Sequence, residues 1–208
     1  MEQAAPRPAP ARPVFARHAA SLLVFRDGPE GTEVLMGLRG AGHRFMPNRL
    51  VFPGGAVDPG DATLPAASEP RPEVLSMLAR GARPRLARAL VVAAARELHE
   101  ETGLTLGEPP RLDGVDYLCR AITPPTLPIR FNARFLAVDA AAVSGRLEGS
   151  GELEALRYVP VAEAMALDLV LVTREVLQRL QLWLALSPAD RAARSRLDVF
   201  KKRQWRLE

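Results

Sequence analysis

The sequence has little of the features on which several classes of protein depend. Its single cysteine, Cys119, excludes an internal disulfide framework and a cysteine-based zinc site. A lone cysteine is typical of a reducing compartment, so we expect a cytoplasmic protein in which this thiol is a small apolar side chain of a strand. The apolar runs, such as residues 89–95, are far shorter than the roughly 18 residues that cross a bilayer. The sequence therefore predicts neither a disulfide-stabilised nor a membrane protein.

Positive charge is in small excess and is confined to the end of the chain. The formal net charge is +4. Residues 190–208 hold seven Arg and Lys against three acids, which accounts for all of that excess. Only Phe200 and Trp205 accompany these charges, too few for the aromatic platform of a single-strand nucleic-acid binder. We therefore interpret the segment as a solvated helix face and do not expect nucleic acid as the main partner.

The length of 208 residues predicts one domain with additions, and 48% apolar with 25% charged residues is typical of a globular chain. Residues 1–14 are rich in Pro, Ala and Arg and lack the apolar stretch of a secretory signal, so we expect a flexible lead. We assign residues 15–170 to the main domain and residues 171–208 to a C-terminal helical extension.

Periodicity predicts strands and helices that interleave without a strict strand–helix–strand alternation. This order favours an α/β fold with a mixed sheet and helices on its faces. The expected strands are residues 19–26, 34–39, 51–53, 117–122, 131–138 and 153–159. The expected helices are residues 73–80, 85–102, 161–166, 174–186 and 188–199. Gly103 is expected to end the long helix in a left-handed conformation.

The long helix carries three carboxylates close to its C-terminal end. Glu97, Glu100 and Glu101 fall within an arc of about 100°. The arc lies beside the apolar stripe that contains Val91 and Leu98, so it borders the buried face. Acidic side chains at this end oppose the helix dipole and repel one another. A divalent cation such as Mg²⁺, which prefers hard oxygen ligands, would reverse both penalties.

On spacing alone, an alternative interpretation is simpler. The same three glutamates form a solvated charged face, in which Arg96 pairs with Glu100 four residues later. The surrounding sequence decides against this alternative. Residues 96–104 read Arg-Glu-Leu-His-Glu-Glu-Thr-Gly-Leu, and Gly55 is followed after five residues by Asp61. This pattern resembles the Nudix box, so the chain is similar to a Nudix hydrolase over residues 15–170, which implies an α/β/α sandwich with a catalytic loop and helix.

The pattern departs from the family in two places. Asp61 stands where the family has Glu, which keeps the charge and shortens the reach. Residues 62–95 separate Asp61 from Arg96, where the family has seven residues, so we expect an insertion at about 62–84. Loop closure costs little more for a longer loop, so the two halves of the box can still meet. This insertion and the stretches 39–55 and 123–135 are similar to the branch that includes coenzyme A diphosphatases.

The resemblance implies hydrolysis of a pyrophosphate that joins a nucleoside to another group, with Mg²⁺ or Mn²⁺ as the cofactor. Implied metal ligands are Glu97, Glu100, Glu101 and the backbone of Gly55. Implied catalytic residues are these three glutamates together with Arg96, which would orient a ligand carboxylate, and Glu152, a loop acid. Residues expected to contact the substrate are Arg39, Arg44, Arg49, Phe52 and Gly54.

The expected partner is a small nucleotide-containing molecule, first of all coenzyme A or an acyl derivative. An ADP-ribose or nucleotide-sugar pyrophosphatase remains an alternative, as does a non-catalytic Nudix domain that binds a nucleotide and regulates a partner. The oligomeric state stays open, with a homodimer as one option. We expect the insertion to cover Leu86 and Leu90 of the long helix with Val74, Leu75 and Leu78, and to wall one side of the substrate cleft.

Overall fold

The computed structural model describes residues 14–40, 42 and 47–208, so most of the predicted N-terminal lead lies outside it. Within this part, nine strands form one sheet in the order β11-β10-β6-β7-β1-β2-β3, with β4 paired to β1 and β9 to β2. The strands are β1 (Arg17–Gly28), β2 (Gly31–Arg39), β3 (Leu50–Val51), β4 (Gly54–Ala56), β6 (Asp116–Ile122), β7 (Phe131–Asp139), β9 (Leu153–Pro160), β10 (Asp198–Lys201) and β11 (Gln204–Leu207). Two further strands, β5 (Leu104–Thr105) and β8 (Ser144–Gly145), pair with each other.

The sheet is mixed, as the sequence predicts. Strand β1 runs parallel to β7 and antiparallel to both β2 and β4. Its first half, with Ala19 opposite Ala56 and Ser21 opposite Gly54, holds β4 in place. The N-terminal end of β1 therefore fixes the double glycine of the predicted box.

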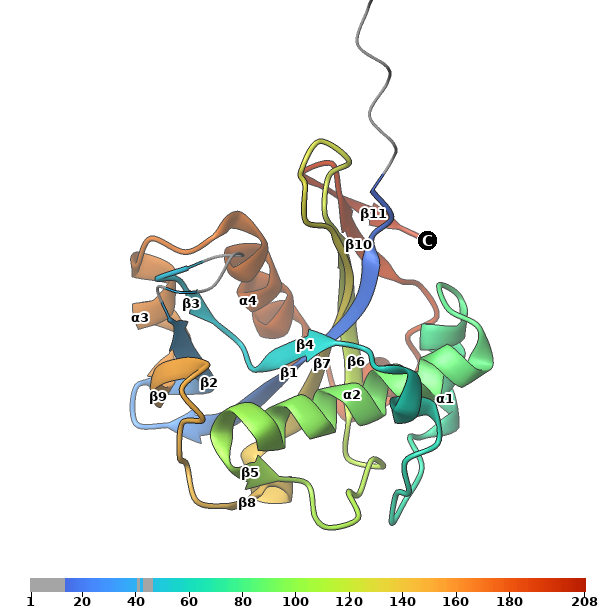
Figure 1. The fold of residues 1–208 in the computed structure, drawn as a ribbon, viewed down its shortest axis with the longest axis horizontal. Coiled ribbons are helices and arrows are strands. Elements are labelled where there is room, and N and C mark those ends of the chain that lie inside the picture. Colours follow the sequence, from blue (N-terminus) through green and yellow to red (C-terminus); the bar gives the residue numbers. More distant parts are fainter. Residues whose placement is uncertain (1–13, 41, 43–46) are drawn as a thin grey trace, which may run out of the picture.

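Helices cover both faces of the sheet (Figure 1). Helices α1 (Pro72–Ala79) and α2 (Pro84–Thr102) pack on one face, and α3 (Val161–Ala166) and α4 (Leu171–Leu184) pack on the other. A short helix α5 (Pro188–Ala192) follows α4. Each face has its own apolar core, centred on Leu22 and Leu90 on one side and on Leu23 and Leu177 on the other. The result is the expected α/β/α sandwich.

Helix α2 is the element that carries the candidate site. Its run of Ala, Leu and Val contains no interior Pro or Gly, and Pro84 occupies the first turn, where its missing N–H costs nothing. Gly103 ends the helix with φ of 72°, and its N–H donates to the carbonyl of His99 at 2.9 Å. The predicted left-handed stop is confirmed.

The segment before α2 is part of the core. Val74 and Leu78 of α1 are buried in the same apolar cluster as Leu90, and Leu75 and Leu86 pack partly buried against it. This confirms that residues 62–84 pack on the first half of α2. Deleting the segment would remove core side chains, so its effect on a substrate cleft is best tested by single substitutions.

The end of the chain differs from the prediction. The expected helix 188–199 ends at Ala192, and β10 and β11 then form a hairpin that extends the sheet. Val199 and Phe200 are buried, and the Trp205 ring lies 5.2 Å from that of Phe200. The prediction of a solvated helix face was wrong because these apolar residues complete the core beside β6. In the described part of the chain, no helix is long and apolar enough to cross a membrane, and Cys119 is buried as expected.

A buried arginine, Arg134, lies on the α1–α2 face beside the partly buried His18 and Arg120, near the connection between these helices. Arg134 is 1% exposed and donates to His18 Nδ1 at 3.1 Å, to the Asn132 carbonyl at 2.8 Å and to the Gly81 carbonyl at 2.5 Å. Burial, with a smaller effect of the charge of Arg120, lowers the pKa of Arg134 to about 10. Burial and then the two arginine charges also lower the pKa of His18 below its usual 6.5.

We expect His18 to make stability depend on pH. A base whose pKa is lowered on folding binds fewer protons in the folded state, so its contribution is complete above the unfolded pKa and is lost as the pH falls below it. The unfolding free energy of the wild type should therefore decrease more steeply than that of His18→Gln between about pH 7 and pH 5. Urea unfolding at several pH values measures this, with His99→Gln, an exposed histidine, as the control. Equal slopes in wild type and His18→Gln would contradict the prediction.

Candidate active site

The predicted carboxylates lie where the second half of α2 meets β4. Glu101 is 2% exposed, and its Oε2 accepts a hydrogen bond from the N–H of Gly54 at 2.7 Å. Gly54 has φ of 153°, and a Cβ there would collide with Ser21 and with the carbonyl of Ala20. Only glycine therefore allows β4 to lie against β1 and still offer its amide to Glu101.

Gly55 permits a second close approach. A Cβ at this position would overlap the carboxylate of Glu97, whose side chain is 13% exposed. Glu100, by contrast, is 56% exposed. The alternative of a solvated charged face is therefore wrong for Glu97 and Glu101 and correct only for Glu100.

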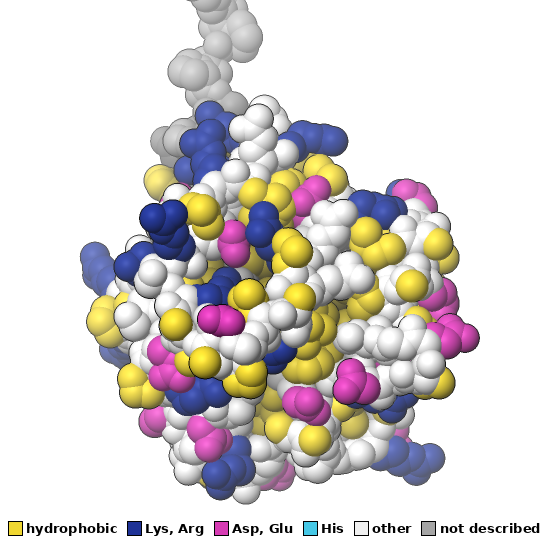
Figure 2. Space-filling model, turned by 180° about the vertical axis from the view of Figure 1, so that it is seen from behind, with side chains coloured by type: hydrophobic (Ala, Val, Ile, Leu, Met, Phe, Trp, Pro, Cys, Tyr) yellow, Lys and Arg dark blue, Asp and Glu magenta, His cyan; other side chains and the backbone are white. Residues whose placement is uncertain are grey.

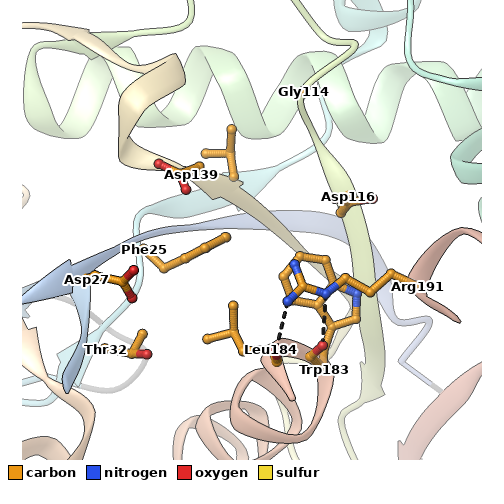
Figure 3. A pocket seen from close by; sticks show the side chains of 10 residues that line it. Phe25, Asp27, Thr32, Gly114, Asp116, Asp139, Trp183, Leu184 and Arg191 are labelled. Carbon is orange, nitrogen blue, oxygen red and sulfur yellow. Dashed lines mark hydrogen bonds between the residues drawn. The ribbon is translucent and has the colours of Figure 1, made fainter. Parts of the chain in front are cut away.

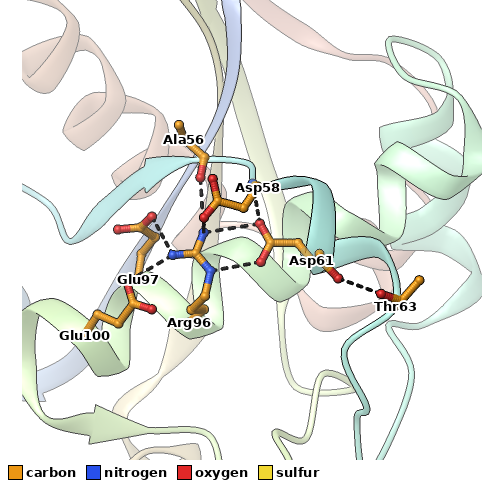
Figure 4. A network of polar contacts seen from close by, with 8 residues as sticks. Ala56, Asp58, Asp61, Thr63, Arg96, Glu97 and Glu100 are labelled. Atoms are coloured by element: carbon orange, nitrogen blue, oxygen red, sulfur yellow. Dashed lines mark hydrogen bonds and ion pairs between the residues drawn. The ribbon is translucent and has the colours of Figure 1, made fainter.

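Arg96 is the centre of the polar network at this site (Figure 4). Its Nη1 donates to Glu97 at 2.9 Å and to Glu100 at 3.1 Å. Its Nε and Nη2 donate to the two carboxylate oxygens of Asp61 at 2.9 and 3.2 Å, and Nη2 also reaches the carbonyl of Ala56 at 3.1 Å. Hydrogen bonding to Asp61 and the charge of Glu97 raise the pKa of Arg96. One guanidinium thus joins both halves of the predicted box.

Asp61 reaches Arg96 from the 3-10 turn η1 (Pro59–Ala62), which lies close to α2. The carboxylate is 1% exposed and also accepts the N–H of Asp58 at 2.7 Å. Asp61 can therefore pair with Arg96 although its side chain is shorter than that of the Glu found in the family, because the turn η1 brings its backbone close to α2. The expectation that the two halves meet across the long spacing is confirmed.

Burial is the largest effect on the pKa values of Glu101 and of the partly buried Glu97. Burial, together with the nearby charges of Glu97 and Glu152, raises the pKa of Glu101 to about 8, against the opposing effects of the Gly54 amide and Arg39. Burial is also the largest cause that raises the pKa of Glu97, with contributions from Glu100 and Glu152 against the charge of Arg96. Negative charge is therefore crowded at this end of α2.

Glu152, the loop acid proposed from the sequence, lies near the carboxylates of α2. Glu152 acts on the pKa values of both Glu97 and Glu101, so its charge lies near them. The loop before it is bound to the end of α2, since the N–H of Glu148 donates to the carbonyl of Thr102 at 2.8 Å. The sequence alone could not establish this proximity, because it depends on the pairing of β9 with β2.

The arginines predicted to bind substrate lie in different surroundings. Arg39, the last residue of β2, lies close enough to Glu101 to lower its pKa, and its Nε is buried without a hydrogen-bond partner in the described structure. Arg49 pairs with Asp168, on the connection between α3 and α4. Arg44 lies outside the described residues.

Phe52 is a core residue. It is 6% exposed, and its ring packs edge to face on Phe135 at 6.2 Å. The ring fills the core between the sheet and α4, where burial of its apolar surface is favourable, and its contact with substrate stays a prediction.

Sequence reasoning missed the role of Asp58. Its amide closes the turn that holds Asp61, and the signal was present as Asp58-Pro59-Gly60-Asp61, an acid followed three residues later by a second acid, with Pro in the first turn. The carbonyl of Ala56, which accepts from Arg96, could not be found from the sequence because a backbone acceptor has no residue signature.

The donor set fits a hard divalent cation. Buried carboxylates with raised pKa values and the exposed Glu100 supply the oxygen ligands that Mg²⁺ and Mn²⁺ prefer. Among the residues that the structure describes, no three Asp, Glu, His or Cys side chains gather as a closed metal site. Arg96 instead holds Glu97 and Glu100, so these two carboxylates would turn toward a bound ion.

A separate cavity of about 510 Å³ lies away from these carboxylates (Figure 3). It is lined by the far end of β1, at Phe25 and Asp27, and by Trp183 and Arg191. Arg191 stacks over the Trp183 ring at 4.1 Å. None of the residues of the predicted box lines it.

We expect Asp61→Asn to destabilise the protein by about 3 kcal/mol, because it removes the charge of a buried pair and leaves Arg96 without its anchor. The unfolding free energy in urea measures this. The control is Asp168→Asn, which breaks the exposed pair with Arg49 and should cost less than about 1 kcal/mol. A loss at Asp61 no larger than that at Asp168 would show that the pairing does not hold the site together.

Comparisons with known proteins agree with this geometry. A model of the NUDIX domain family matches residues 87–180, from α2 to α4. A NUDIX hydrolase from Alicyclobacillus acidocaldarius is 28% identical with a TM-score of 0.59, and the match covers 79% of this chain and 90% of that one. A comparison with curated proteins found no match.

Two more distant structures share the fold. A MutT NUDIX hydrolase from Burkholderia pseudomallei is 20% identical, with a TM-score of 0.53 over 80% of this chain and 98% of that one. The NUDIX domain of NrtR from Shewanella oneidensis, solved with ADP ribose, is 14% identical, with a TM-score of 0.54 over 83% and 90% of the two chains. The family model, the box residues 96–104 inside the matched segment and the shared fold together show a Nudix domain over residues 87–180.

Proposed function

We propose that this protein is a divalent-metal-dependent hydrolase that cleaves the pyrophosphate of a nucleoside diphosphate linked to another group. The observation that carries the proposal is the pair formed by the buried Glu101 and the partly buried Glu97 against the double glycine of β4. Burial of two neighbouring carboxylates opposes their ionisation. A site that gathers such groups is suited to bind a cation, and the family generally uses Mg²⁺ or Mn²⁺.

The residues that would hold the metal are Glu97, Glu100 and Glu101, with the backbone of Gly55. A bound Mg²⁺ or Mn²⁺ supplies charge neutralisation at the pyrophosphate oxygens and acidifies water. Arg96 positions the first two carboxylates through its Nη1. The network therefore keeps these two carboxylates at the site, where they would turn from Arg96 toward the bound ion.

Two further residues support the reaction. Arg39 has a buried Nε without a hydrogen-bond partner in the described part of the chain, so its charge is suited to a substrate phosphate. Glu152, whose charge is felt by both buried glutamates, is the candidate to accept a proton from water. Arg49 supports the same anionic substrate less directly, because it already pairs with Asp168.

The substrate that we place first is coenzyme A or an acyl derivative, cut to an adenosine bisphosphate and a phosphopantetheine product. Its support is the sequence similarity at 39–55 and 123–135 and the long segment between the halves of the box. ADP-ribose or a nucleotide sugar is the alternative, favoured by the ADP ribose bound in the Shewanella oneidensis domain. A regulatory domain that only binds a nucleotide is disfavoured by the complete set Arg96, Glu97, Glu100 and Glu101.

A substrate panel tests the proposal. Coenzyme A, acetyl-coenzyme A, ADP-ribose and a nucleotide sugar are each incubated with Mg²⁺, with Mn²⁺ and with EDTA, and products are identified by mass spectrometry. We expect cleavage at the pyrophosphate only with metal, with the highest kcat/KM for coenzyme A or its acyl derivative. Tight binding of one compound without cleavage of any would favour the regulatory domain.

We further expect Glu101→Gln and Glu100→Gln each to lower the hydrolysis rate more than tenfold at saturating Mg²⁺, because each removes a charge that holds the metal, and tenfold is only about 1.4 kcal/mol. Glu148→Gln is the matched control, since that side chain is 62% exposed and pairs only with Arg146 among the described residues. Circular dichroism checks that the variants are folded. Rates above a tenth of the wild type in both would remove these residues from the ligand set.

A further inference from the structure

The helix that carries the carboxylates binds the preceding segment with a second arginine. Arg88, on α2, donates from Nη1 to the carbonyl of Ala62 at 3.2 Å and from Nη2 to the carbonyl of Leu64 at 3.0 Å. Its Nε and Nη2 also form a two-pronged pair with Glu69, at 2.8 and 2.9 Å. Hydrogen bonding to Arg88 lowers the pKa of Glu69, in agreement with this pairing.

These bonds begin at the residue that follows Asp61. The turn η1 ends at Ala62, so Arg88 holds the exit of the same turn whose Asp61 carboxylate binds Arg96. Arg88 and Arg96 are eight residues apart, about 12 Å along the helix axis. Helix α2 therefore binds the short stretch from Asp61 to Leu64 through two side chains, Arg96 and Arg88.

Apolar packing does little to fix this stretch. Pro59, Gly60 and Thr63 are exposed, and Leu64 is 41% exposed. Within the turn, the backbone bonds are those from Asp61 to Asp58 at 3.1 Å and from Thr63 to Gly60 at 2.9 Å. The position of the turn against α2 therefore depends on polar anchors. Arg88 is one of them, because it donates hydrogen bonds to three acceptors, the Ala62 carbonyl, the Leu64 carbonyl and the Glu69 carboxylate.

We propose that Arg88 is a positioning residue of the candidate active site. By holding the carbonyls of Ala62 and Leu64, it keeps Asp61 in register with Arg96, and Arg96 in turn keeps Glu97 and Glu100 oriented. The planar fork of arginine serves carbonyl and carboxylate acceptors at once, which a lysine ammonium does not. The kinetic part of the inference rests on the proposed hydrolase function, and the structural part does not.

The test compares Arg88→Gln with Arg85→Gln. Arg85 is an exposed arginine in the first turn of α2 with no polar contact in the described structure, so the charge change is matched. Hydrogen exchange followed by NMR should show faster exchange at the amides of Asp58 and Asp61, about tenfold or more, only in Arg88→Gln. With the substrate found in the panel, the kcat of Arg88→Gln should fall about tenfold while its KM stays within about twofold of the wild type. The reason is that misplaced catalytic carboxylates slow the reaction more than they weaken substrate binding.

Two more variants separate the carbonyl anchors from the ion pair. Glu69→Gln removes only the ion pair and should keep at least half of the wild-type kcat, whereas Arg88→Lys should resemble Arg88→Gln. Unchanged amide exchange at Asp58 and Asp61 in Arg88→Gln would overturn the inference, as would an equal loss of kcat in Arg85→Gln. If the wild type hydrolyses nothing in the panel, the proposed function fails, and the exchange measurement still decides the role of Arg88.

Discussion

The close contact between α2 and β4 is the constraint on which the rest of the site depends. The Gly54 amide binds Glu101, and the absence of a side chain at Gly55 leaves room for the carboxylate of Glu97. Both contacts need the pairing of β4 with the first half of β1. The site is therefore a property of the sheet edge and the helix together, and neither element would hold the carboxylates alone.

The charge balance explains why the network is built around one arginine. Asp61, Glu97 and Glu100 all accept hydrogen bonds from Arg96, and Asp58 pairs with it at 3.9 Å, so four carboxylates share one cation. Glu101 is buried beside them. Leaving negative charge in excess in a partly buried place is unfavourable for folding. Such an excess of negative charge is expected where the functional protein binds a divalent cation, because the cation would neutralise the carboxylates that Arg96 alone does not balance.

Much of the fold could be predicted from the sequence because periodicity and helix ends are local signals. The bounds of α2 follow from its uninterrupted apolar pattern and from Gly103, and β1 and β2 follow from two apolar runs on either side of a glycine turn. The hairpin β10–β11 could not be predicted, since Val199 and Phe200 form a strand only because β6 offers an edge. Short strands of this kind take their stability from tertiary pairing.

The site shows the same division between local and distant information. Residue type and helical period place Glu97, Glu100 and Glu101 on one arc of α2, but only the resemblance of residues 96–104 to the Nudix box predicts them as metal ligands. Phe52 could not be placed from the sequence, because an apolar residue before a glycine turn fits a core and a binding surface equally well. The long stretch between Asp61 and Arg96 is the clearest example. The sequence indicates that its ends can meet, but only the packing of α1 and the bonds of Arg88 explain how a chain of that length returns to α2 with Asp61 in place. A longer connection then costs little, because its contacts with the core replace the order that a short loop would have imposed.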